Sequence, residues 1–244
     1  MKILLLDIET SPNTAFVWGL FKETIPLARL IESSEVMCWS AKWLGDDVMM
    51  HDSVFRSKPQ EMLAKIHLLL DTADVVVHYN GQQFDIPCLN KEFLLYGMTP
   101  PAPYKQVDLL KTVRSQFKFT SNKLDYVVQK LGIGEKLETN FQLWVDCMQR
   151  DPIAWEKMEG YNKHDVTILE RLYKVLRPWV VSHPNRTLYT DATDTMCPVC
   201  GSKHHTCEGY AYTTAGKYQR YRCKDCGKWY RGRKNVALKQ TVNY

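Results

Sequence analysis

Five residues in this 244-residue sequence have the types and spacing needed for metal-assisted chemistry: Asp7, Glu9, Asp85, Tyr161 and Asp165. Asp7 and Glu9 are two residues apart at the end of an aliphatic run, so on a β-strand both side chains point to the same face. Tyr161 and Asp165 are four residues apart, so on a helix they share one face. Carboxylates held close together repel one another unless a cation neutralises them. The pattern therefore suggests a metal site.

Each of these groups also has an ordinary structural explanation when it is considered alone. A single Asp-x-Glu sequence is weak support for a metal site. Asp85 follows the turn-forming Asn80-Gly81 and could be an acid in the first turn of a helix, where the helix dipole favours it. Tyr161 and Asp165 could be a boundary tyrosine and a solvated acid. Only their occurrence together favours a functional site.

The elements that would position these residues indicate an α/β domain. Strands are expected at residues 3–9, 16–18, 36–39, 48–50, 74–79 and 106–108, and helices at 62–70, 89–96, 122–131 and 153–176. Asp151-Pro152 supplies an N-cap and a first-turn proline for the last helix. Residues 21–34 are expected to be irregular. Strands followed by strand–helix alternation predict a mixed sheet flanked by helices.

In their order along the chain, three motifs resemble those of the DEDD (DnaQ-like) 3′–5′ exonucleases. The motifs are Leu6–Thr10, His78–Asp85 and Tyr161-x3-Asp165. This superfamily has an RNase H-like fold and includes the proofreading domains of family B DNA polymerases, and the resemblance covers roughly residues 1–180. Tyr161 stands where the tyrosine subtype has its tyrosine, whereas Gly160 stands where the histidine subtype has its histidine.

The resemblance implies hydrolysis of phosphodiester bonds with two Mg²⁺ or Mn²⁺ ions, a pair that stabilises both the attacking and the leaving oxygen. Asp7 would bridge the two ions. Glu9 and Asp165 would help to hold the ion that activates water, and Asp85 would support the other ion. Tyr161 would orient the attacking water, because a phenol with a pKa near 10 is a poor general base at neutral pH.

Substrate contacts are expected at Asn80 and Phe84, which resemble family positions beside the bound strand. The resemblance also implies that the backbone near Thr10 would lie close to the terminal 3′-OH. His164 neighbours the last acid in sequence but points about 100° away from it on an ideal helix. We interpret His164 as a bystander or a substrate contact.

Two Cys-x-x-Cys pairs predict a zinc ribbon near the C-terminus. Cys197 and Cys200 form the first pair, and Cys223 and Cys226 form the second; each pair is followed by glycine. Four thiolates complete a tetrahedral site for one Zn²⁺, and so small a segment would depend on the metal for its folding free energy.

The charge of the chain is concentrated in the same region. Residues 191–244 contain ten basic and four acidic residues, whereas residues 1–190 contain 22 basic and 23 acidic residues. Aromatic residues alternate with the cations, as in proteins that hold single strands by base stacking, and we expect Tyr221 and Trp229 to stack on bases. The alternative is a structural ribbon that docks on the nuclease domain or on a protein partner.

These features predict four segments: an RNase H-like exonuclease domain (1–182), a linker (183–195), a zinc ribbon (196–232) and a basic tail (233–244). No apolar run approaches the about 18 residues that span a bilayer, and the N-terminus turns acidic too early for a signal peptide. We therefore expect a cytoplasmic protein, from a bacterium or from a virus in its host, with no membrane contact.

The expected function is a 3′–5′ exonuclease that acts on DNA, at single-stranded ends, and releases nucleoside 5′-monophosphates. The expected partners are nucleic acid, with DNA ahead of RNA, and a replication or repair protein. The alternatives are an exoribonuclease or a structure-specific endonuclease that uses the same site, because the 2′-OH is sensed by the shape of a pocket. A third alternative is a non-catalytic nucleic-acid-binding module.

Overall fold

A computed structural model describes residues 1–190 and 195–237 of the chain. The chain divides into two units: Lys2–Leu172, and Tyr173–Tyr244 together with Met1. The first unit contains the acidic motifs and the second contains the cysteine pairs.

A five-stranded sheet forms the centre of the first unit, in the order β5-β4-β1-β6-β7. Its strands are β1 (Ile3–Thr10), β4 (Val36–Trp43), β5 (Met49–Ser53), β6 (Val75–His78) and β7 (Lys105–Asp108). Strands β1, β6 and β7 are parallel, whereas β4 is antiparallel to both β1 and β5. Parallel strands end at the same edge of a sheet, where ligand sites of α/β folds commonly form. This edge carries Glu9, His78 and Asp108.

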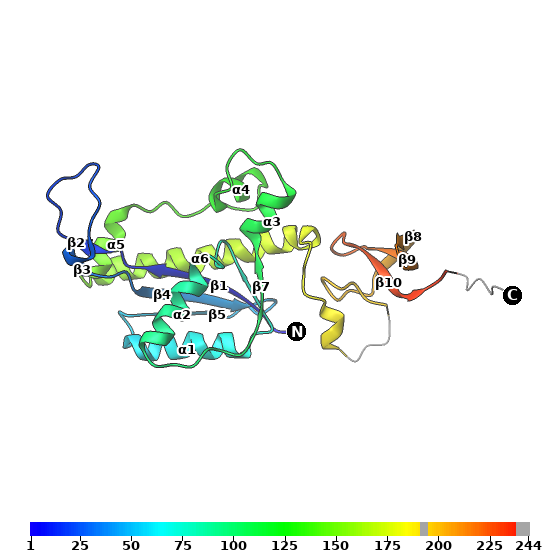
Figure 1. Ribbon diagram of the computed structural model, residues 1–244, viewed down its shortest axis with the longest axis horizontal. Coiled ribbons are helices and arrows are strands. Elements are labelled where there is room, and N and C mark those ends of the chain that lie inside the picture. Colours follow the sequence, from blue (N-terminus) through cyan, green and yellow to red (C-terminus); the bar gives the residue numbers. More distant parts are fainter. Residues whose placement is uncertain (191–194, 238–244) are drawn as a thin grey trace. The chain divides into compact units, whose positions relative to one another are not determined.

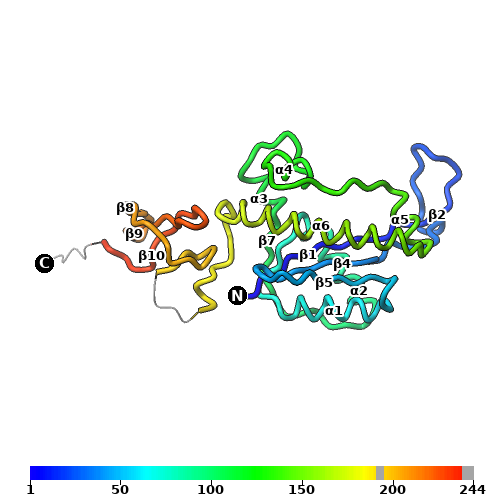
Figure 2. The backbone as a smooth tube through the Cα atoms, turned by 180° about the vertical axis from the view of Figure 1, so that it is seen from behind, coloured from blue at the N-terminus to red at the C-terminus, as the bar shows by residue number. Residues whose placement is uncertain are grey.

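Helices cover both faces of the sheet. They are α1 (Pro59–Thr72), α2 (Asp85–Leu95), α3 (Leu109–Gln116), α4 (Leu124–Lys130), α5 (Phe141–Met148) and α6 (Pro152–Leu176). Figures 1 and 2 show α1 and α2 on one face and the long helix α6 across the other. Leu4, Leu6 and Ile8 of β1 belong to the core shared with α1 and α2. Asp7 and Glu9 alternate with them and therefore point to the α6 side.

Helix α6 begins where the N-cap and first-turn proline predicted from the sequence place its start. The Asp151 side chain accepts hydrogen bonds from the backbone N–H groups of Ile153 (2.7 Å) and Ala154 (3.3 Å), and Pro152 is the first helical residue. The predicted mixed sheet flanked by helices is confirmed.

The region after β1 differs from the prediction. Phe16–Trp18 does not form a strand, because the paired segments are β2 (Thr14–Ala15) and β3 (Leu30–Glu32). Phe16 and Trp18 are 73% and 90% exposed, so their side chains have no core to enter. Residues 21–34, expected to be irregular, contain a 3-10 turn at Leu27–Arg29 as well as β3.

The second unit contains a three-stranded antiparallel sheet in the order β10-β9-β8. Its strands are β8 (His205–Thr213), β9 (Gly216–Cys223) and β10 (Trp229–Asn235). Strand β10 runs past residue 232, where the ribbon was expected to end. The expected linker contains a 3-10 helix at Arg186–Tyr189, and the expected basic tail lies outside the described residues from position 238 onward.

Candidate active site and cysteine cluster

Three of the four predicted acids form one cluster. Carboxylate oxygens of Asp7, Glu9 and Asp165 all lie within 4.8 Å of one another. Asp7 and Glu9 come from the end of β1, and Asp165 comes from α6, with only 2% of its surface exposed. Oxygen ligands in this arrangement suit a hard divalent cation such as Mg²⁺ or Mn²⁺.

Asp85 stands beside this cluster rather than inside it. It is the first residue of α2, and its Oδ1 accepts a hydrogen bond from the backbone N–H of Ile8 (3.3 Å). Ile8 lies between Asp7 and Glu9, so this bond ties the start of α2 to the strand that carries the other acids.

The electrostatics of the cluster favour a bound cation. Burial, together with the charges of Asp85, Glu9 and Asp165, raises the pKa of Asp7 well above its usual range. Burial raises the pKa of Glu9 to about 8, with Asp165 adding to the effect, and burial raises the pKa of Asp85 to about 7. Each of these shifts reflects the cost of a buried negative charge, which a divalent ion would remove. Asp165 Oδ1, which is buried without a hydrogen-bond partner among the described residues, also fits a metal ligand.

Lys136 is a site residue that the sequence motifs did not reveal. Its Nζ lies 2.6 Å from Asp165 Oδ2 and donates a hydrogen bond to Tyr161 Oη (3.0 Å). Burial lowers the pKa of Lys136, but Asp165 and Tyr161 outweigh burial, so the net shift is upward and the ammonium stays charged. Lys136 lies outside any regular element and at no characteristic spacing from the acids, so no local signal identifies it.

Asn162 is a second site residue that the sequence motifs did not reveal. Its Nδ2 donates a hydrogen bond of 2.7 Å to Asp7 Oδ2, and its side chain is fully buried. The amide therefore fixes the orientation of the Asp7 carboxylate. Its position directly after Tyr161 is the signal that could have drawn attention to it.

The phenol of Tyr161 lies at the edge of the acidic cluster. Burial and the charge of Asp165 raise its pKa, while the hydrogen bond from Lys136 opposes that rise. A cavity of about 780 Å³ adjoins Tyr161 and is also lined by Asn140, Lys157 and Gly160. The neutral phenol thus borders a space large enough for part of a substrate.

The turn between β6 and α2 is held by a buried hydrogen-bond network. Asn80 has a positive φ of 73°, and its backbone N–H donates to Asp108 Oδ1 (3.0 Å). The Gly81 N–H donates to Nδ1 of the fully buried His78 (3.0 Å). Phe84, the residue before Asp85, is 42% exposed at the end of this turn. The network fixes the segment that carries Asn80, Phe84 and Asp85.

The structure also shows the surroundings of Thr10 and His164, two residues that the sequence analysis singled out. Thr10 lines a cavity of about 380 Å³ together with Phe141 and Trp144. His164 Nε2 contacts the backbone oxygen of Glu135 (2.8 Å), so its ring is engaged outside the acidic cluster.

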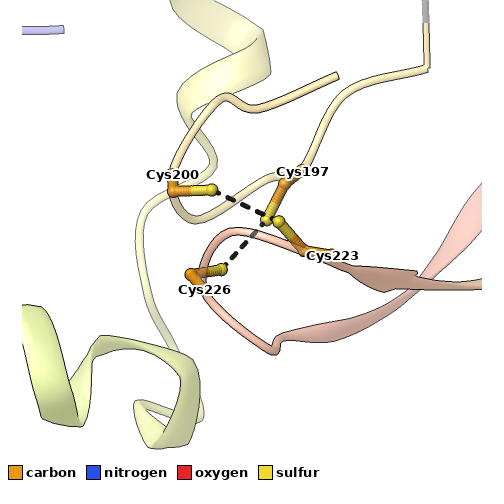
Figure 3. A group of neighbouring side chains, drawn as sticks. All are labelled: Cys197, Cys200, Cys223 and Cys226. Atoms are coloured by element: carbon orange, nitrogen blue, oxygen red, sulfur yellow. Dashed lines mark hydrogen bonds between the residues drawn. The ribbon is translucent and has the colours of Figure 1, made fainter. Parts of the chain in front are cut away.

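The four cysteines of the second unit converge, as Figure 3 shows. The Sγ atoms of Cys197, Cys200, Cys223 and Cys226 all lie within 4.8 Å of one another. The pairs Cys197–Cys226 and Cys200–Cys223 are 3.6 and 3.5 Å apart. All eight cysteines of the chain are free thiols. Four thiols at such separations could hold a tetrahedral metal ion.

The two cysteine turns have the same backbone geometry. Gly201 and Gly227 both adopt a φ of 78°, and their N–H groups donate to the carbonyls of Cys197 and Cys223 (2.9 and 3.0 Å). A left-handed residue at the equivalent place in both turns explains why each Cys-x-x-Cys is followed by glycine.

Tyr221 and Trp229, both predicted to contact nucleic acid, do not lie together. Tyr221 pairs with Tyr230 across β9 and β10, and their rings stack with centroids 5.4 Å apart. Trp229 pairs with Arg222 and is therefore on the opposite face of the sheet.

None of the helices in the described parts of the chain combines the length and the apolar composition that a bilayer crossing requires.

Comparison with known proteins agrees with the observed sheet topology. The chain is similar in structure to the family B DNA polymerase from the hyperthermophilic archaeon Pyrobaculum calidifontis, with a TM-score of 0.54 and 18% sequence identity. The similar region covers 72% of this chain and 24% of the polymerase, and at this identity the likeness concerns the fold. No curated protein matches the chain.

A sequence profile of the RNase H superfamily matches residues 4–177. This span contains nearly all of the central sheet and the four acids Asp7, Glu9, Asp85 and Asp165. The match extends over most of the chain. The chain therefore belongs to the RNase H superfamily.

Proposed function

We propose that the protein is a metal-dependent 3′–5′ exonuclease of the DEDD type, tyrosine subtype, that acts on single-stranded DNA ends. The observation that carries the proposal is the convergence of Asp7, Glu9 and Asp165, with Asp85 bonded to the same strand and Tyr161 at the edge of the cluster. In this proposal residues 1–182 form the exonuclease domain, and the protein works in the cytoplasm on DNA that replication or repair supplies.

The acidic cluster would hold two Mg²⁺ or Mn²⁺ ions. Asp7 would contribute to both sites, Glu9 and Asp165 to one, and Asp85 to the other. When bound, such a pair lowers the pKa of water and stabilises the oxygens around phosphorus. Its products would be nucleoside 5′-monophosphates.

The remaining side chains of the site would act by position and charge. Tyr161, kept neutral by its raised pKa, would donate or accept a hydrogen bond that orients the attacking water. Lys136 holds both the Tyr161 hydroxyl and the Asp165 carboxylate, so it would fix the distance between them. Thr10, Asn80 and Phe84 would contact the terminal nucleotides.

The cysteine cluster would hold one Zn²⁺, which would make residues 196–235 a zinc ribbon. Contact with Cys197 and burial raise the pKa of the Cys200 thiol to about 12 in the metal-free form. Metal binding would therefore displace protons from these thiols. We further propose that the ribbon holds the nucleic-acid strand.

The test is digestion of 5′-labelled and 3′-labelled single strands in the presence of Mn²⁺. A 3′–5′ exonuclease shortens the 5′-labelled strand stepwise and releases labelled mononucleotide at once from the 3′-labelled strand. Cleavage of a circular single strand would instead indicate an endonuclease, and faster cleavage of RNA than of DNA would indicate an exoribonuclease.

Variants of the site test the assignment of roles. Asp7→Ala and Asp165→Ala should each remove nearly all activity, because loss of a ligand disrupts the metal pair. Tyr161→Phe should be milder, since only one orienting hydrogen bond is lost. Circular dichroism of each variant controls for folding, and activity of Asp7→Ala close to that of the wild type would refute the proposal.

A further inference from the structure

The two faces of the sheet formed by β8, β9 and β10 differ in chemistry. Residues directly opposite each other in antiparallel strands share a face. Trp229 pairs with Arg222, and Arg231 pairs with Arg220, while Tyr218 lies two positions before Arg220 on the same strand. We call these five residues the arginine face.

The cations of the arginine face are held over its aromatic rings. The guanidinium carbons of Arg220 and Arg222 lie 4.9 and 5.6 Å from the centroid of the Trp229 ring. The guanidinium of Arg231 lies 4.1 Å from the centroid of the Tyr218 ring. Such contacts hold a guanidinium extended along the surface while its N–H groups stay available. Trp229 itself is 44% exposed, so part of its ring remains free.

The positive charge of this face is not neutralised locally. Within residues 1–190 and 195–237, none of the three arginines forms an ion pair with a carboxylate. Arg220 donates through Nε to the backbone oxygen of Glu208 (2.8 Å), which leaves its terminal nitrogens for another acceptor. Arg222 and Arg231 are exposed. Three adjacent guanidiniums without acidic partners match a polyanion.

The opposite face is used for packing. Tyr221 stacks on Tyr230, and the ring of His205 meets Tyr221 edge-on with centroids 4.8 Å apart. Toward the β8–β9 turn this face carries Lys217, whose Nζ lies 4.0 Å from the centroid of the Tyr210 ring, and Lys234, which is on the same side of β10 as Tyr230. The rings of this face are packed against one another, which makes it a poorer match for stacking on the bases of a strand.

We infer that the arginine face is the surface that binds a single strand of nucleic acid. Arg222 and Arg231 would contact successive phosphates, and the free part of the Trp229 ring would stack on an unpaired base. A base can stack in this way only if it is not covered by its neighbours in a duplex, which favours a single strand. The inference rests on the proposed function, since it specifies which surface of the ribbon holds the strand.

Binding of a long labelled single strand to the full chain tests this inference. All proteins carry Asp165→Ala so that the strand is not degraded, and no chelator is present. Trp229→Ala should weaken binding about 5- to 150-fold if the ring stacks on a base. Arg222→Ala combined with Arg231→Ala should reduce the slope of log affinity against log salt by about 1.4, since each phosphate contact on a single strand contributes about 0.7.

Matched controls come from outside the arginine face. Tyr212→Ala removes a ring that is 73% exposed on the other face, and Lys217→Ala combined with Lys234→Ala removes the same number of charges from that face. These controls should bind nearly as tightly as the parent protein. Equal losses in the controls and in the arginine-face variants would refute the inference, as would tighter binding of a duplex than of a single strand. Zinc content measured for each variant shows that the ribbon is intact.

A separate measurement tests the proposed exonuclease activity. Hydrolysis of a trinucleotide by the unmodified protein reports on the acidic cluster alone. Absence of hydrolysis would contradict the exonuclease, whereas a difference in binding between the two faces would still support the arginine face.

Discussion

The acidic residues of the candidate active site have raised pKa values because burial and mutual repulsion penalise their charged forms. For Glu9 the folded-state pKa is about 8, against an ordinary value of 4.5. A carboxyl group with a raised folded-state pKa favours folding below its unfolded pKa, and this contribution is lost as the pH rises through the folded pKa. The metal-free protein should therefore lose stability between about pH 4.5 and pH 8.

This loss of stability with rising pH leads to a prediction about metal binding. Mn²⁺ should raise the melting temperature more at pH 8 than at pH 5.5, because at the higher pH the ion relieves repulsion between ionised carboxylates. Thermal unfolding with and without Mn²⁺ at both pH values measures this. In Asp7→Ala the difference between the two pH values should shrink, and an equal stabilisation by Mn²⁺ at both pH values in the parent protein would contradict the expectation.

Asn162 should affect the metal site through Asp7. Asn162→Ala removes the hydrogen bond to Asp7 Oδ2 and should weaken Mn²⁺ binding by about 10-fold or more, as loss of outer-sphere hydrogen bonds commonly does. Titration calorimetry or electron paramagnetic resonance of Mn²⁺ provides the measurement. His164→Ala on the same helix is the control, because that ring contacts the Glu135 carbonyl and should leave Mn²⁺ affinity unchanged.

Among the elements, the turn from β6 to α2 has little space for a larger side chain. A Cβ atom at Gly81 would lie 2.4 Å from Cγ of His78, and the fully buried imidazole has no space into which to move. Gly81→Ala should therefore destabilise the protein by about 1–3 kcal/mol, as overpacking does. It should also reduce activity, because the turn carries Asn80 and leads into Asp85.

Gly160→Ala is a control for which we expect the free energy of unfolding to rise instead of fall. Gly160 lies within α6, and a Cβ atom there meets nothing within 4 Å. The substitution should raise the free energy of unfolding by up to about 1 kcal/mol through improved helix propensity. Denaturant unfolding of both variants distinguishes a local clash at Gly81 from a general intolerance of glycine replacement.

For the molecule as a whole, the two units should depend differently on zinc. In the second unit, the buried cluster around the cysteines consists of Cys197, Val199 and Cys223, which is too small a core to hold β8 to β10 together without a metal. The first unit has an extensive core around β1, α1 and α2. Removal of zinc should therefore expose the amides of β8 to β10 to hydrogen exchange while those of β1 and β6 stay protected.

Cysteine variants make this prediction specific. Cys223→Ser should abolish the bound Zn²⁺ and reproduce the exchange pattern of the metal-free protein. Cys207→Ser should retain one Zn²⁺ per chain, because Cys207 is exposed and outside the cysteine cluster. Zinc content by a colorimetric chelator and hydrogen exchange by mass spectrometry provide the two measurements, and full zinc occupancy in Cys223→Ser would contradict the assignment.

The amino-acid sequence alone was sufficient for features that depend on local periodicity and spacing. The aliphatic run of β1, the capped start of α6 and the paired Cys-x-x-Cys turns are each encoded within one short segment. The mixed sheet could be predicted from the order of strands and helices, whereas its RNase H-like character was implied by the resemblance of the three motifs to known exonucleases. Short elements were missed: α3 and α5 have eight residues each, and their stability depends on the surfaces they cover. Phe16–Trp18 has strand-forming residues but no partner strand, so local propensity was misleading there.

Contacts between distant segments were decided by the tertiary structure. Lys136 comes from an irregular segment and reaches Asp165 because α6 and that segment pack together, and Asn162 reaches Asp7 from 155 residues away. The two faces of the sheet formed by β8, β9 and β10 also depend on pairing, since the register shift in β8 changes which of its residues share a face. Residue types limit the possible chemistry. The distances between side chains, however, depend on how distant segments pack together, and no short stretch of sequence determines that packing.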